Sequence, residues 1–124
     1  MHEIRLAGPW EHLEDAATYR VTLPQALSQG TAIRRRFHSP TGLSDETRLF
    51  VAVHRTENSG MLKVTCNGHD LIEAFDEEIL LFEVTMQIEQ HNELVLRPAG
   101  EESAGVEAVC LRICEPRSDD TMPS

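Results

Sequence analysis

The segment 62–98 constrains the fold more than any other part of this chain. In residues 62–66 apolar and polar side chains alternate, a pattern typical of a strand with one face in a core. Asn67 and Gly68 follow directly, and this pair is the strongest short-range signal for a hairpin, because both residues tolerate a positive φ. Two further runs of strand character complete the segment, 80–85 and 92–96. The segment therefore predicts antiparallel strands joined by tight turns.

The rest of the chain repeats this pattern at short intervals. Five more strands are expected, at 3–6, 18–23, 32–38, 47–54 and 106–114. The stretch 11–17 is expected to be irregular with one short helical turn, and 25–29 to be a loop or a brief helix. About eight short strands with almost no helix predict an all-β fold, an antiparallel β-sandwich of jelly-roll type.

Length and composition set the domain organisation. The chain has 124 residues, which suits one domain, and we assign residues 1–115 to it. Residues 116–124 are polar and contain two of the six prolines, so we expect a flexible tail there.

The net charge bears on partners. At pH 7 the formal charge is −10, which argues against nucleic acid and against anionic membrane surfaces as partners. The three cysteines, Cys66, Cys110 and Cys114, do not have the number or spacing of a disulfide framework. We expect reduced thiols, and with no signal-peptide pattern at the N-terminus we expect a cytoplasmic protein.

The order of the motifs resembles a known family. Val64-Thr65-Cys66-Asn67-Gly68 is followed by Phe82-Glu83-Val84-Thr85 and then by Asn92-Glu93-Leu94-Val95-Leu96. This order resembles the galactose-binding-domain-like jelly roll, in particular the sugar-binding domain of family 2 glycoside hydrolases. The opening run from Ile4 to Trp10 looks like the first strand of that domain. The resemblance implies the jelly-roll fold and an accessory, carbohydrate-binding role, and the catalytic barrel of those enzymes is absent from this sequence.

Five residues are candidates for ligand binding. In the strand 32–38, alternation places Arg34, Arg36 and His38 on one face. These side chains can pair with carboxylates of this acidic protein, or they can hold an anionic or hydroxyl-rich ligand. Trp10 can stack on a sugar ring or fill the core, and His69 lies beside the Asn67-Gly68 turn, within reach of a ligand at that end.

Catalytic and metal-binding motifs are not found in the sequence. It contains no G-x-S-x-G elbow, no phosphate-binding loop and no HExxH spacing among its six histidines. We therefore expect no catalytic residues, no metal ligands and no cofactor, with a small hydrolase as the least favoured class. Cys66 faces the same way as Val64 and is interpreted as a core residue.

Two function classes stay open. The first is a small non-catalytic binding module with a carbohydrate ligand, and the second is a protein-interaction or self-assembly module. An exposed Trp10 in a polar groove favours the first class. A buried Trp10 with a broad apolar outer sheet face favours the second.

Overall fold

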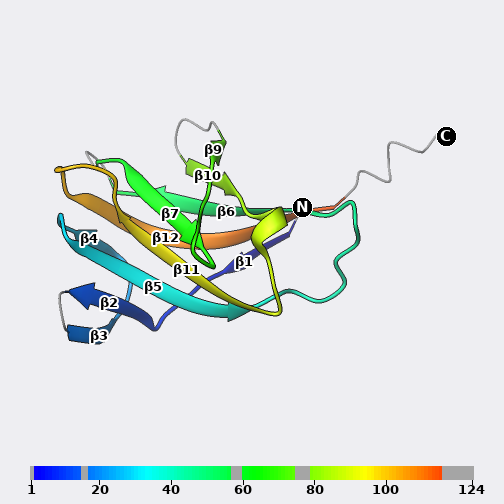
Figure 1. The fold of residues 1–124 in the computed structure, drawn as a ribbon, viewed down its shortest axis with the longest axis horizontal. Coiled ribbons are helices and arrows are strands. Elements are labelled where there is room, and N and C mark those ends of the chain that lie inside the picture. Colours follow the sequence, from blue (N-terminus) through cyan, green and yellow to red (C-terminus); the bar gives the residue numbers. More distant parts are fainter. Residues whose placement is uncertain (1, 15–16, 57–59, 75–78, 116–124) are drawn as a thin grey trace.

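The computed structural model describes residues 2–14, 17–56, 60–74 and 79–115. Its strands form two six-stranded sheets that face each other, and all pairings are antiparallel (Figure 1). The predicted all-β antiparallel sandwich is confirmed, while the jelly-roll subtype stays a prediction. The assignment of 1–115 to one domain also stays a prediction, and the expected tail, 116–124, lies outside the described residues.

The first sheet, sheet A, has the order β1-β12-β6-β10-β9, with β4 also paired to β12. Its strands are β1 (His2–Arg5), β4 (Gln25–Leu27), β6 (Arg48–Arg55), β9 (Glu73–Ala74), β10 (Ile79–Glu83) and β12 (Ala104–Cys114). The second sheet, sheet B, has the order β3-β2-β5-β11-β7-β8. Its strands are β2 (Trp10–Glu14), β3 (Ala17–Val21), β5 (Thr31–His38), β7 (Leu62–Cys66), β8 (His69–Asp70) and β11 (His91–Pro98). A single turn of 3-10 helix, η1 (Thr85–Gln87), precedes β11.

The core lies between the two sheets and follows the alternation of the sequence. On β6 the side chains of Leu49, Val51 and Val53 point inward and are buried. On β12, Val109 and Leu111 do the same, while Cys110 and Arg112 lie on the other face at intermediate exposure, as predicted. Burial of such alternating apolar side chains is the main stabilising contribution to a sandwich of this kind.

Two segments differ from the sequence-based expectation. Residues 10–14 form β2, a strand inside sheet B, where we expected an irregular segment with a helical turn. Residues 25–27 form β4, where we expected a loop or a brief helix. In β2 the buried positions alternate with less buried ones, and the buried position 12 holds a histidine. Because this inward residue is polar, the sequence lacks the apolar alternation that would have predicted a strand here. Strands β4, β8 and β9 have two or three residues each, too few to give a periodic signal.

The hairpin turn between β7 and β8 is confirmed. Asn67 has a φ of 53° and Gly68 a φ of 84°, the left-handed conformations that this tight turn requires. Cys66 pairs with His69 across the turn, which fixes the register of the short edge strand β8.

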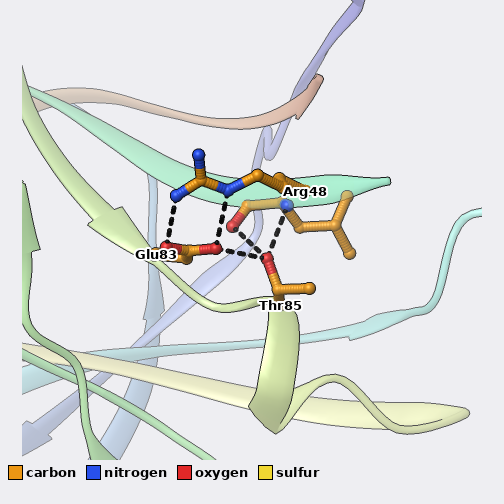
Figure 2. A network of polar contacts seen from close by, with 4 residues as sticks. Arg48, Glu83 and Thr85 are labelled. Atoms are coloured by element: carbon orange, nitrogen blue, oxygen red, sulfur yellow. Dashed lines mark hydrogen bonds and ion pairs between the residues drawn. The ribbon is translucent and has the colours of Figure 1, made fainter. Parts of the chain in front are cut away.

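A polar cluster fixes the start of β6 against the end of β10 (Figure 2). The guanidinium of Arg48 donates two hydrogen bonds to Glu83, at 3.1 Å from Nε and 2.8 Å from Nη2. Thr85 donates to Glu83 from its hydroxyl at 3.0 Å and accepts from the backbone N–H of Leu49 at 2.9 Å. The hydrogen bond from Arg48 lowers the pKa of Glu83, since it stabilises the charged carboxylate.

Candidate functional site

An open hollow at one end of sheet B is lined by polar side chains from neighbouring strands. We call it the β5–β11 hollow. Its volume is about 410 Å³, and it is lined by Arg36, Phe37, His38, Asn67, His91, Asn92 and Glu93. It lies where β5 ends, β11 begins and the β7–β8 turn approaches β11. Ligand pockets commonly range from about 300 to 1,000 Å³, so the hollow has the size of a site for a small ligand.

Strand β5 supplies the cationic part of the site. Arg34 and Arg36 lie on its outer face, as alternation predicts, and each is opposite a β11 residue of the same face. Arg34 is largely covered and is bonded to Glu11 of β2, at 2.9 Å, and lies 3.8 Å from Glu93. This hydrogen bond lowers the pKa of Glu11. The predicted pairing of these arginines with carboxylates is therefore confirmed.

Arg36 differs from Arg34 in its accessibility. Its side chain is 65% exposed, and its Nη2 lies 3.5 Å from Oε2 of Glu93, a long ion pair. Within the part of the chain that the structure describes, the other guanidinium N–H groups of Arg36 have no partner. Arg36 can therefore donate hydrogen bonds to a ligand in the hollow, whereas Arg34 serves to hold Glu11 and Glu93 in place.

Two histidines face each other at the rim of the hollow. His38 on β5 is directly opposite His91 on β11, and their ring centroids are 4.6 Å apart at an interplanar angle of 67°. Both side chains are exposed. Each imidazole carries one nitrogen that donates and one that accepts when it is neutral, so the pair presents both kinds of group to a ligand.

Two asparagines form the frame of the hollow rather than its ligand groups. Asn67 donates to the carbonyl of Gln87 at 2.7 Å and to Oδ1 of Asn92 at 3.0 Å, and it accepts from the N–H of Glu93 at 2.9 Å. Asn92 is buried, and its side-chain amide makes two hydrogen bonds to the backbone of Glu89. Its Oδ1 accepts from the N–H of Glu89, and its Nδ2 donates to the carbonyl of Glu89. These bonds occupy both side-chain amides, and they hold the turn, η1 and β11 in one arrangement.

Trp10 does not line this hollow. It is 0% exposed in the core, and its indole N–H donates to the carbonyl of Leu6 at 3.0 Å. A ring with no exposed face cannot stack on a sugar, so the stacking interpretation of Trp10 is corrected and the core interpretation holds.

His69 is on the other side of sheet B. It pairs with Cys66, whose side chain points into the core, and antiparallel partners share a face. His69 is exposed because β8 is an edge strand, but its side chain does not line the β5–β11 hollow. Of the five residues that the sequence suggests, the structure brings together Arg36 and His38, with Arg34 beside them.

The sequence did not reveal the role of β11. His91 and Glu93 complete the site because β11 pairs with β5 in a register that puts them opposite His38 and Arg36. The strand 92–96 was predicted, but its neighbour and register depend on the whole topology, which alternation alone does not specify.

The structure gives no sign of a reactive thiol or a metal cluster at this site. Burial raises the pKa of the Cys66 thiol to about 11. The thiol therefore stays protonated at neutral pH, which fits a core residue and argues against a nucleophilic cysteine. Across residues 2–14, 17–56, 60–74 and 79–115, no group of three or more His, Cys, Asp or Glu side chains is placed to hold a metal ion. Over the same ranges no helix has the length and apolar character needed to cross a membrane.

The fold is one that occurs as part of glycoside hydrolases. An FMN-binding β-glucuronidase from Facaelibacterium prausnitzii L2-6 matches with a TM-score of 0.69 and 18% identity over 89% of this chain. A β-glycosidase from Bacteroides vulgatus matches with a TM-score of 0.67 and 13% identity over 94% of this chain. No protein-family model and no curated protein matches the sequence.

The extent of these matches limits what they show. This chain spans 22% of the β-glucuronidase and 20% of the β-glycosidase, so it corresponds to about a fifth of either enzyme. At such identities the likeness shows a shared fold alone, and a fold by itself does not define an activity.

Proposed function

We propose that the protein is a non-catalytic binding module that holds a carbohydrate in the β5–β11 hollow. The observation that carries the proposal is the set of accessible polar side chains there: Arg36, His38, His91 and Glu93 face one open hollow on adjacent strands. Sites built on strands hold their side chains more closely than sites on mobile loops. Planar donors and acceptors of this kind suit the hydroxyl groups of a sugar.

Two further observations support this assignment. The Asn67 and Asn92 amides fix the frame of the hollow, so a ligand meets a preformed surface and little ordering is needed on binding. The similar domains come from proteins named as a glucuronidase and a glycosidase, which act on carbohydrates. The three free cysteines favour the cytoplasm as the compartment of this module.

A glycan-array screen of the purified protein tests this function. We expect binding by the wild-type chain and its loss in Arg36→Ala and His91→Ala. Lys63→Ala is the matched control, because Lys63 is an exposed cation of the same sheet that does not line the hollow. An array without binding, from protein that is folded by circular dichroism, would contradict carbohydrate recognition.

A second candidate function is self-assembly through a different surface. Ile72 and Met86 are 84% and 87% exposed, and both line a hollow of about 400 Å³ between β8 and η1. Large exposed apolar side chains that share one concave surface favour a protein contact. Sedimentation at increasing concentration tests this: self-association that Ile72→Asp abolishes would favour assembly, and a monomer at all concentrations would exclude it.

A further inference from the structure

The outer face of sheet B has a charge opposite in sign to the rest of the protein. The chain carries a formal charge of −10, with 11 basic and 21 acidic residues. Strand register puts five of the basic residues on this one face, together with only three carboxylates in the part that the structure describes. The basic residues are Arg20, Arg34, Arg36, Lys63 and Arg97, and the carboxylates are Glu11, Asp70 and Glu93.

The carboxylates on this face are engaged by its own cations. Arg34 holds Glu11 at 2.9 Å, and Lys63 lies 3.6 Å from Asp70. Glu93, the one carboxylate in the hollow, has its Oε2 between Arg34 and Arg36, at 3.8 and 3.5 Å. Its negative charge is thereby shared by two guanidinium groups, and Arg36, whose side chain is exposed, lines the hollow.

The geometry points to an acidic sugar as the ligand, and we propose that the β5–β11 hollow recognises the carboxylate of a uronic acid residue. This inference rests on the proposed carbohydrate-binding function. Arg36 donates a charge-assisted pair of hydrogen bonds to the carboxylate, which is the geometry that a guanidinium matches best. His38 and His91 contact the same ring from the rim, and Glu93 accepts hydrogen bonds from its hydroxyl groups.

Glu93 also accounts for selection of a sugar over a simple anion. A carboxylate in the hollow repels a small polyvalent anion such as phosphate, whereas it bonds a neutral hydroxyl. A ligand that combines one negative charge with several hydroxyl groups satisfies both Arg36 and Glu93. A uronic acid has this combination, and a neutral hexose lacks the part that Arg36 binds.

Calorimetric titration with two matched oligosaccharides tests the inference. The two differ only in the terminal residue, which is glucuronic acid in one and glucose in the other. We expect the acidic oligosaccharide to bind about tenfold more tightly or better, as a charge-assisted contact predicts. In Arg36→Gln this preference should disappear. Arg20→Gln should retain it, because it removes the same charge from the same face at an exposed position outside the hollow.

Each alternative result has a distinct meaning. Equal affinity for the two oligosaccharides would overturn the acidic-sugar inference and leave the binding function intact, while no binding of either would overturn both. An equal loss in Arg36→Gln and Arg20→Gln would show diffuse attraction by the face and would also overturn it. Tighter binding of a sulfated analogue or of a single-stranded oligonucleotide would assign the face to another anion.

Discussion

Asn67 combines an unfavourable backbone conformation with three side-chain hydrogen bonds. Its φ of 53° is costly for most residues, and its amide bonds Gln87, Asn92 and Glu93. We predict that Asn67→Ala lowers the free energy of unfolding by about 2–3 kcal/mol, from lost hydrogen bonds and backbone strain together. Chemical denaturation followed by circular dichroism measures the change.

Asn67→Gly separates the two contributions. Glycine accepts the positive φ but makes no side-chain hydrogen bond, so this variant should be about 1 kcal/mol more stable than Asn67→Ala. Equal stabilities would show that the backbone conformation carries no cost at this turn.

Trp10 is a core residue and the only tryptophan of the chain. Its fluorescence should therefore have a blue-shifted maximum, be poorly quenched by iodide, and stay unchanged when a ligand fills the β5–β11 hollow. Trp10→Ala should lower the free energy of unfolding by about 3–5 kcal/mol, because it leaves a large cavity. Ready quenching by iodide in the folded protein would contradict the burial of this ring.

Strand β5 shows how far alternation predicts a site. It correctly placed Arg34, Arg36 and His38 on one face, since the side-chain period of a strand is two. It did not show that β11 is the neighbour of β5, so the facing His91 was missed. It also did not distinguish an accessible arginine from a paired one, because that depends on where Glu11 and Glu93 lie.

The junction of β6 and β10 provides a pH-dependent contribution to stability. The hydrogen bond from Arg48 lowers the pKa of Glu83 below the usual range of a carboxyl group. The pair therefore stabilises the fold at neutral pH, and this stabilisation is lost as the pH falls from the usual carboxyl range through the lowered pKa of Glu83. We predict that Glu83→Gln lowers the free energy of unfolding by about 0.5–1 kcal/mol at pH 7, as expected for a partly exposed pair. The difference from the wild type should shrink as the pH falls below the usual range of a carboxyl group, because both proteins then lack the charged carboxylate.

Denaturation at several pH values measures this difference. Glu101→Gln is the control, since Glu101 is an exposed residue of the loop before β12. A difference between Glu83→Gln and the wild type that stays constant from pH 7 to pH 3 would contradict the role of the ionised carboxylate.

For the molecule as a whole, the sandwich was predictable because the long strands carry strong signals. The run 49–53, the Asn67-Gly68 turn and the alternation in 106–114 each required a strand, and strands without helices can bury their apolar faces only in packed sheets. The short strands β4, β8 and β9 were missed because pairing with longer neighbours, rather than their own sequence, specifies them.

The distribution of charge over the surface can be recognised only from the fold of the whole molecule. The net charge of −10 argued against nucleic acid and anionic membrane surfaces, and it did not reveal the basic outer face of sheet B. This face is formed by residues from strands that are far apart in the sequence, namely β3, β5, β7 and β11. A local run of basic residues therefore does not predict it.

The central claim, that ligand binds at the end of β5 and β11, is tested most directly by nuclear magnetic resonance. Backbone amide shifts of the isotope-labelled protein are followed during titration with the oligosaccharide that ends in glucuronic acid. We predict changes concentrated at residues 36–38, 67 and 91–93, with those of β6 and β12 unchanged. Changes confined to sheet A, or none at saturating ligand, would contradict the account.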